Sequence, residues 1–196
     1  MKGSTPAVLL MNPKHAHNVG NALRACSCFG GRQLLWTGNR VTLDVEKGER
    51  LPREERMKQY QNVEMIRSER PFDLFPRGVV PVAIEVRENA EPLHSFEHPE
   101  DALYVFGPED GSIPSWALRH CHRFIVIPSN HCLNLASAVN LVLGHRRMQR
   151  ILKGVESPIY PGVAEDRGFI QDGSEVFSGI SEEGLGAAYA SHRRTK

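Results

Sequence analysis

The chain has 196 residues, of which 40% are hydrophobic and 24% charged, a composition typical of one globular α/β or α+β domain with a buried core. Its 24 basic and 23 acidic residues leave a net charge of +1, which excludes a strongly basic nucleic-acid-binding protein, so any RNA surface must come from local clusters. No apolar run reaches the roughly 20 residues of a membrane helix, and residues 1–11 turn polar too soon for a secretory signal, so we expect a cytoplasmic protein.

The four cysteines are expected to be small buried or half-buried thiols. Cys26 and Cys28 are separated by one residue, whereas paired zinc ligands are separated by two to four, and no second pair follows. In the absence of a secretory signal, paired disulfides are not expected either. We therefore expect neither a metal nor a disulfide at Cys26, Cys28, Cys121 or Cys132.

The first forty residues are predicted to form a strand, a helix and a second strand. Residues 7–11 (AVLLM) are a short apolar run that ends at an Asn-Pro turn. From Asn18 to Phe29 apolar residues recur at spacings of three and four, which indicates one face of a helix, and the glycine pair at 30–31 ends it. Residues 33–37 (QLLWT) predict the second strand. Because a crossover helix joins the strands, we predict an α/β fold with a mostly parallel sheet flanked by helices.

Residues 39–77 are less regular and carry many charges of both signs. We predict a short exposed helix between residues 52 and 61, followed by a loop. Mixed charge of this kind is typical of a solvated surface, and a contact between residues 50–58 and RNA is the alternative.

Order returns in the second half of the domain. Residues 79–86 (VVPVAIEV) predict a strand whose internal proline indicates an edge position or a start after the proline. Residues 103–106 (LYVF) predict a buried strand, residues 115–121 a short helix, and residues 124–127 (FIVI) the last strand.

A long helix is predicted for residues 133–153, with Leu135, Val139, Leu143 and either Met148 or Ile151 buried. After it the sequence is rich in glycine, serine, proline and acids, with hydrophobic residues scattered singly. We therefore predict a domain over residues 1–153 and a polar tail with little regular structure over residues 154–196.

Three segments each combine a strand end with glycine, proline or asparagine and a following helix: residues 12–24, 107–111 and 127–134. Ligands bind at the carboxyl ends of strands in open parallel sheets, so we expect a small-molecule site where these segments meet. The sequence lacks the glycine motifs of dinucleotide and nucleoside-triphosphate sites and the serine elbow of hydrolases. The polar residues in the segments suit the positioning of a hydroxyl and an anion: Asn18, Arg24, Glu109, Cys132 and Asn134.

These segments resemble the three motifs of the SpoU (TrmH-type) branch of the SPOUT superfamily. Residues 18–24 (NVGNALR), followed by Phe-Gly, are similar to motif one. Residues 103–111 (LYVFGPEDG) are similar to motif two, and Ile-Pro at 127–128 with residues 132–139 (CLNLASAV) is similar to motif three. The resemblance covers residues 7–150, with the motifs in order and at compatible spacing.

The resemblance implies an RNA ribose 2′-O-methyltransferase that uses S-adenosylmethionine and acts on tRNA or rRNA. It also implies a trefoil knot that holds the cofactor, and a homodimer in which each active site is completed across the interface. The positions that match cofactor-contacting residues are Glu85, Gly107, Ile127, Cys132 and Leu133. The positions that match catalytic residues are Arg24, Asn18, Glu109 and Asn134.

Each catalytic assignment has an alternative. Arg24 is assigned to the reacting hydroxyl or the adjacent phosphate, and its alternative is a solvated helix residue. Asn18 and Asn134 are also suited to capping helices, with Asn18 where an N-cap is expected. Glu109 is expected to orient Arg24 or a loop backbone group, or to interact with a helix dipole.

The family commonly has serine where this chain has Cys132, and a thiol is the weaker hydrogen-bonding group. The leading alternative function is therefore a knotted RNA-binding protein without catalysis, and a cysteine hydrolase is a third. For phosphate contacts we consider the basic end of the long helix. Its candidate residues are His145, Arg146, Arg147, Arg150 and Lys153.

Overall fold

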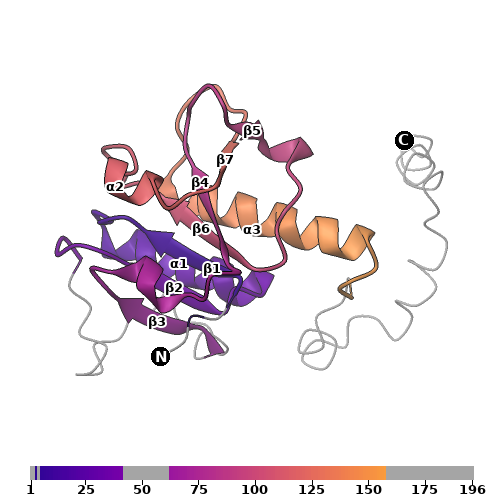
Figure 1. Cartoon of the computed structure of the whole chain (residues 1–196), viewed down its shortest axis with the longest axis horizontal. Helices are drawn as coiled ribbons and strands as arrows, with labels where there is room; N and C mark the ends of the chain where they lie inside the picture. Colours follow the sequence, from indigo (N-terminus) through magenta and orange to yellow (C-terminus); the bar gives the residue numbers. More distant parts are fainter. Residues whose placement is uncertain (1–2, 4, 42–61, 158–196) are drawn as a thin grey trace, which may run out of the picture. The chain divides into compact units, whose positions relative to one another are not determined.

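The computed structural model describes residue 3 and residues 5–41 and 62–157, and the chain divides into two units, residues 1–150 and 151–196. The first unit contains a seven-stranded sheet in the order β3-β2-β1-β6-β4-β7-β5, and all its pairings are parallel (Figure 1). The mostly parallel α/β fold predicted from the sequence is confirmed. The trefoil knot stays a prediction.

The strands are β1 (Ala7–Leu10), β2 (Gln33–Trp36), β3 (Glu64–Arg67), β4 (Val80–Ile84), β5 (Glu91–Pro92), β6 (Ala102–Phe106) and β7 (Arg123–Val126). The α-helices are α1 (Ala16–Phe29), α2 (Ser115–Leu118) and α3 (Leu135–Leu152). Two single turns of 3₁₀-helix, η3 (Pro71–Leu74) and η4 (Leu93–Ser95), complete the described elements.

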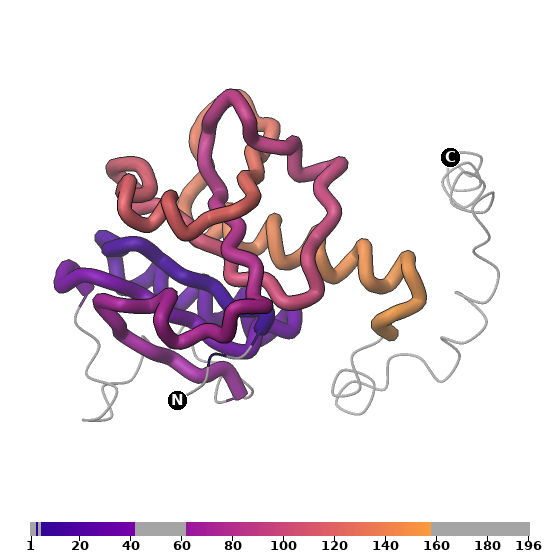
Figure 2. Tube along the Cα trace, in the orientation of Figure 1, coloured from indigo at the N-terminus to yellow at the C-terminus, as the bar shows by residue number. Residues whose placement is uncertain are grey.

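The sheet separates two apolar clusters because successive side chains of a strand point to opposite faces. On one face, Val8 and Tyr104 pack with the apolar sides of α1 and α3. On the other, Leu9 and Val105 pack with α2 and with the aromatic residues of the 72–75 segment. The central strands β1 and β6 are distant in sequence but lie side by side, as the colours of Figure 2 show. Both are fully buried, which fits their uninterrupted apolar sequences.

The predicted strand–helix–strand opening is confirmed, with one shift. Helix α1 begins at Ala16, two residues before the predicted start at Asn18, and its N-cap is His15. The helix ends at Gly30, whose φ of 79° lies in the left-handed region that glycine adopts without strain. The glycine pair therefore terminates the helix as predicted.

Strand β4 corrects the expectation that Pro81 marks an edge or a strand start. The strand lies between β6 and β7, and Pro81 is its second residue. Its neighbours Val80 and Val82 face β6 in register, whereas the pairing with β7 begins only at Val82. The missing N–H of Pro81 points to a position before β7 begins, so an interior strand tolerates the proline.

Two short strands were not predicted. Residues 64–67, expected in a loop, form β3 at one edge of the sheet, and residues 91–92 form β5 at the other. Both lack the apolar run that marks a strand in sequence, because edge strands are partly exposed. The helix predicted for residues 52–61 lies outside the described residues.

Helix α3 buries Leu135, Val139 and Leu143 as predicted. The prediction that either Met148 or Ile151 is also buried is wrong. The Met148 side chain is 62% exposed, and Ile151 is only half-buried. Of the cysteines, Cys26 and Cys121 are buried, but Cys28 and Cys132 are exposed, which corrects the expectation for those two. Within the described ranges, no helix is long and apolar enough to cross a membrane.

Candidate active site

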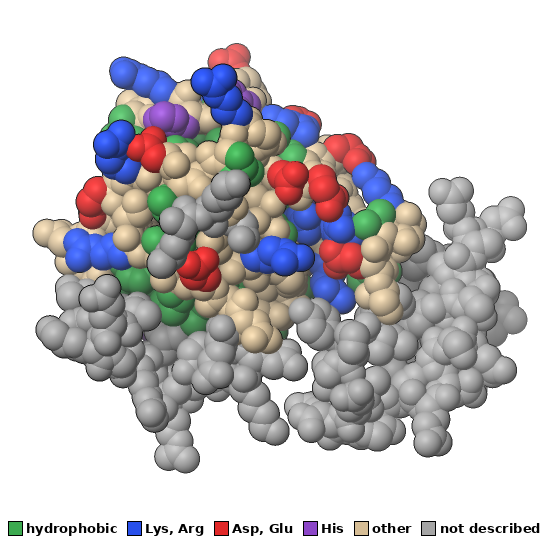
Figure 3. Space-filling view, turned by 60° about the horizontal axis from the view of Figure 1, so that its bottom comes forward, with side chains coloured by type: hydrophobic (Ala, Val, Ile, Leu, Met, Phe, Trp, Pro, Cys, Tyr) green, Lys and Arg blue, Asp and Glu red, His purple; other side chains and the backbone are tan. Residues whose placement is uncertain are grey.

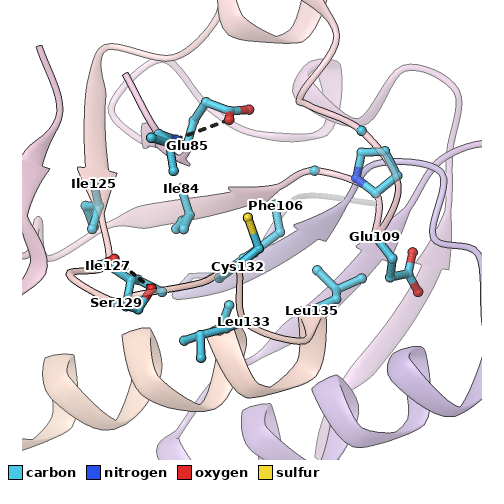
Figure 4. Close-up of a pocket in the computed structure, with 15 residues that line it drawn as sticks. Ile84, Glu85, Phe106, Glu109, Ile125, Ile127, Ser129, Cys132, Leu133 and Leu135 are labelled. Carbon is cyan, nitrogen blue, oxygen red and sulfur yellow. Dashed lines mark hydrogen bonds between the residues drawn. The ribbon is translucent and has the colours of Figure 1, made fainter. Parts of the chain in front are cut away.

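A pocket of about 180 Å³ lies at the carboxyl ends of β4, β6 and β7 (Figure 4). Two of the three segments predicted to form a site, residues 107–111 and 127–134, line it, whereas the third, residues 12–24, does not, and the end of β4 takes its place. Its walls come from the end of β4, from the loop after β6, and from the segment between β7 and α3. The five positions assigned to cofactor binding all line it: Glu85, Gly107, Ile127, Cys132 and Leu133.

The pocket wall is mainly apolar. Ile84, Ile125, Ile127 and Leu133 all line the pocket, and the Leu133 side chain is 42% exposed. The Cys132 thiol points toward the middle of the pocket in Figure 4. A wall of this kind suits a ligand with a flat apolar ring, held by the backbone groups of the surrounding loops.

Glu85 fixes the loop that follows β6. Its Oε2 atom accepts a hydrogen bond of 2.9 Å from the backbone N–H of Ile113, and its Oε1 atom accepts one from Val86 N–H. Gly107, at the start of this loop, permits a close backbone approach. A Cβ atom there would lie 3.1 Å from the nitrogen of Ile113 and 3.3 Å from the carbonyl oxygen of Gly111. Because both contacts are with backbone atoms, a side chain at position 107 would displace the pocket wall.

Three of the predicted catalytic residues form one hydrogen-bonded chain, here called the clamp: Glu109, Asn18 and Asn134. The side-chain amide of Asn18 donates to Glu109 Oε1 at 2.6 Å, and Asn18 Oδ1 accepts from the amide of Asn134 at 3.0 Å. Asn18 lies on α1, Glu109 follows β6, and Asn134 precedes α3. The clamp therefore joins the three motif segments at one point beside the pocket.

Glu109 also holds the backbone at the start of α1. Its two carboxylate oxygens accept from the N–H groups of Lys14, at 2.7 Å, and His15, at 3.3 Å. Partial burial raises the pKa of the Glu109 carboxyl, but the hydrogen bonds from Asn18, Lys14 and His15 outweigh it, so the pKa lies below its usual value. The carboxylate is thus ionised at the positive end of a helix.

The structure decides between the two roles considered for each asparagine. Asn18 is 1% exposed and lies inside α1, so the N-cap interpretation is wrong for it. Asn134 does cap α3, because its Oδ1 atom accepts from the N–H groups of Ala136 and Ser137. Asn134 thereby serves both the helix and the clamp.

Arg24 is not part of the clamp, and no hydrogen bond joins it to Glu109. It is exposed on α1, in a stripe with His17, Asn21 and Cys28. It lies six positions after Asn18, which is about 9 Å along the helix axis. Of the three roles predicted for Glu109, the structure therefore supports the orientation of loop backbone groups and the interaction with the start of α1, but not the orientation of Arg24. Among the described residues Arg24 has no carboxylate partner, so its guanidinium is available to an external anion.

An ion-pair cluster beside the clamp was not predicted. The guanidinium of Arg40 donates two hydrogen bonds, of 2.9 and 2.7 Å, to Asp110, and Lys14 Nζ lies 3.4 Å from the same carboxylate. The hydrogen bonds from Arg40 hold the pKa of Asp110 well below its usual range. No spacing in the sequence signals this contact, because Arg40 and Asp110 come from loops after different strands.

The structure weakens two alternatives. Among the described residues no hydrogen bond joins Cys132 to a histidine ring, so the thiol lacks the neighbouring base that a cysteine hydrolase needs. Arg146 is 4% exposed and donates to the carbonyl of Glu100, and Arg150 forms an ion pair with the Glu100 carboxylate. The prediction of a phosphate contact at Arg146 is therefore wrong.

The ring of His145, another predicted phosphate contact, is hydrogen-bonded to His98 at 2.9 Å. Burial lowers the pKa of His145, which disfavours the charged form that would bind phosphate. The stretch at residues 50–58 lies outside the described residues. Within the described ranges no group of three potential metal-binding side chains occurs.

The fold and the pocket define an α/β domain with a candidate small-ligand site at the carboxyl edge of a parallel sheet. The model of the SpoU rRNA Methylase family matches residues 6–144, and the chain belongs to this family. The resemblance found in the three motifs is thereby confirmed. A search of curated proteins found no match.

Several solved structures share the fold. The TrmH/SpoU tRNA modifying enzyme from A. aeolicus is 19% identical, with a TM-score of 0.63 over 79% of this chain and 80% of that one. A structure described as giving insights into the 2-OH methylation of C/U34 on tRNA is 24% identical, with a TM-score of 0.62 over 76% and 96%. An AdoMet-bound rRNA methyltransferase from Sinorhizobium meliloti is 21% identical, with a TM-score of 0.60 over 76% and 57%.

Proposed function

We propose that the protein transfers a methyl group from S-adenosylmethionine to a ribose 2′-hydroxyl of tRNA or rRNA. The observation that carries the proposal is the clamp, which draws the three family motifs together beside a pocket lined by all five predicted cofactor positions. The family to which the chain belongs is one of RNA methylases. Solved structures of the same fold include an AdoMet-bound rRNA methyltransferase and one concerned with 2-OH methylation on tRNA.

The residues present fit the cofactor. The apolar wall of Ile84, Ile125 and Ile127 suits an adenine ring, and the close backbone approach at Gly107 leaves amide and carbonyl groups along the rim. Glu85 keeps the rim in place through Ile113. When bound, S-adenosylmethionine supplies an electrophilic methyl group attached to a sulfonium.

The chain must then align the ribose oxygen and balance the charge that develops on it. Arg24 is the proposed group, because it is exposed and no described carboxylate neutralises it. A guanidinium stays protonated at neutral pH, so Arg24 acts as a donor to a phosphate or to the developing oxyanion, and not as the base. The hydroxyl oxygen forms a bond to the methyl carbon as the bond from that carbon to the sulfonium breaks, and the hydroxyl proton passes to solvent water. The clamp contributes indirectly, by holding the backbone before α1 through Glu109.

We further propose a homodimer. Arg24 lies outside the lining of the pocket in its own subunit, on the exposed stripe of α1. A two-fold interface along this stripe would bring Arg24 of one subunit to the pocket of the other. Each active site would then need two chains.

Titration calorimetry with S-adenosylmethionine and with its demethylated product tests the proposal. We expect binding of about one cofactor per chain, and transfer of tritiated methyl to bulk tRNA or rRNA. The transferred label should lie on ribose, which nuclease digestion and mass spectrometry would show. Binding of neither ligand, with or without RNA, would refute the methyltransferase proposal.

The Cys132 thiol in the pocket favours a second candidate, an RNA-binding protein without catalysis, since the family commonly has serine there. The same titration separates the two functions. RNA binding without cofactor binding or transfer supports the second. Restoration of transfer by Cys132→Ser would identify the thiol as the cause.

A further inference from the structure

A strip of three aromatic rings lies on the surface where η3 meets α2, on the face of the sheet opposite α1 and α3. The rings of Phe72 and His120 are stacked, with centroids 4.4 Å apart and an interplanar angle of 13°. Trp116 packs edge-on against Phe72 at 6.1 Å. Phe72 is half-buried and anchors the strip, whereas Trp116 is 44% exposed and His120 is exposed. The strip therefore offers ring faces to an external partner.

The surroundings of the strip favour an anionic partner. Residues 114–122 contain Arg119, His120 and His122 and no acidic residue. Among the described residues Arg119 has no carboxylate partner. The one acid of η3, Asp73, is paired with Arg70 at 2.7 Å. Figure 3 shows histidine and basic side chains at its upper left, with acidic side chains beside them.

The strip is held near the pocket by the chain between them. Gly111 lines the pocket, Ile113 is buried and held by Glu85, and α2 begins two residues later at Ser115. Ala117, on the inner side of α2, is fully buried against the sheet. The position of Trp116 is thus set by the same loop that shapes the pocket wall.

We propose that this strip is a stacking platform for an unpaired nucleotide of the RNA substrate, with Trp116 as its main ring and Arg119 as a phosphate contact. The inference rests on the proposed function, since it names how that substrate is held. Bases stack on aromatic rings whatever their sequence, and the guanidinium of Arg119 beside the rings attracts a phosphate. A protein partner would leave Arg119 without a counter-charge unless it brought its own acid.

The fluorescence of the full-length protein provides a direct test, because the chain has two tryptophans and Trp36 is 1% exposed. A single-stranded 12-nucleotide oligouridylate should quench the emission of the wild type through stacking on Trp116. In Trp116→Phe the remaining emission of Trp36 should be unchanged by RNA, although the phenyl ring keeps the affinity within about threefold. Quenching of the same size in Trp116→Phe would overturn the proposal.

Trp116→Leu is the matched comparison, because leucine keeps an apolar side chain but has no ring face. We expect its affinity for the oligonucleotide to fall about tenfold, and its KM for RNA to rise with kcat nearly unchanged. Arg119→Gln should lower the salt dependence of binding by about one counterion. Wild-type RNA affinity in Trp116→Leu would overturn the inference, as would a change of oligomeric state in that variant with no change in RNA binding.

These outcomes are distinct from failure of the proposed function. If the wild type binds S-adenosylmethionine and methylates RNA while Trp116→Leu behaves like it, the methyltransferase proposal stands and the platform is refuted. If the wild type binds no cofactor but its Trp116 emission is still quenched by RNA, the platform stands and the methyltransferase proposal fails.

Discussion

The substitution Asn18→Asp tests the clamp, because it changes one NH₂ group to oxygen with almost no change in shape. In the wild type this amide donates to Glu109 at 2.6 Å from a side chain that is 1% exposed. The substitution places two carboxylates at the same distance. If both were ionised, their repulsion would be about 6 kcal/mol at an effective dielectric constant of 20. Because one carboxyl can take up a proton instead, the loss of stability is limited to the cost of protonation.

Holding a proton at pH 7 on a carboxyl whose ordinary pKa is near 4 costs about 4 kcal/mol. We therefore expect Asn18→Asp to lower the melting temperature by about 8–16 °C at pH 7. The shared proton gives the folded variant a raised pKa, and stability from such a group is present at low pH and lost as pH rises. The deficit should accordingly shrink by about 1.4 kcal/mol for each unit between pH 7 and pH 5.

Thermal unfolding followed by circular dichroism at pH 7 and pH 5 measures this difference. Asn18→Ala is the control, since it removes the hydrogen bonds to Glu109 and Asn134 without adding charge, and its deficit should be about 2–4 kcal/mol with little dependence on pH. Because the pKa of wild-type Glu109 is lowered, the stability that its ionised carboxylate contributes is lost only as the pH falls below the ordinary pKa of the group, which is outside the range from pH 5 to pH 7. An acidic residue in the first turn of a helix usually stabilises the helix, so without the clamp Asn18→Asp should not lower the melting temperature. A melting temperature at or above that of the wild type at pH 7 would therefore show that the clamp does not hold the site together.

Three further predictions concern the pocket and the dimer. Gly107→Ala should weaken S-adenosylmethionine binding about tenfold in calorimetry, because its Cβ meets backbone atoms at 3.1–3.3 Å; unchanged affinity would show that the wall adapts. Iodoacetamide at pH 7.5 should label the exposed Cys28 and Cys132 and spare Cys26, because burial raises the pKa of the Cys26 thiol to about 12. Bound cofactor should protect Cys132 alone, and peptide mass spectrometry measures this labelling. Equal labelling of Cys132 with and without cofactor would place the ligand elsewhere. Arg24→Ala mixed in equal amounts with Gly107→Val should regain about a quarter of wild-type methyl transfer, because about half of the dimers are mixed and each mixed dimer has one intact site. An inactive mixture in which mixed dimers do form would exclude a site shared between subunits.

The sequence alone determined the fold class, the central strands and two of the three segments that line the pocket, residues 107–111 and 127–134. Buried parallel strands are apolar throughout, so β1 and β6 are visible as short uninterrupted runs. The terminating glycines of α1 are equally local signals. Four of the five pocket positions could be assigned because the motif segments carry them, and Glu85 could be assigned from the resemblance at the end of the 79–86 strand; each one lines the pocket.

Only the tertiary structure decided how those residues act. Whether Asn18 caps α1 or joins Glu109 depends on where a loop from a distant strand lies, and no local pattern contains that distance. The ion pair of Arg40 with Asp110 has the same origin, as does the burial of Arg146, which reads in sequence as an exposed charge. Local sequence fixes backbone conformation and the buried face of each element, because these depend on neighbouring residues. The partner of a polar side chain is fixed by the packing of the whole sheet.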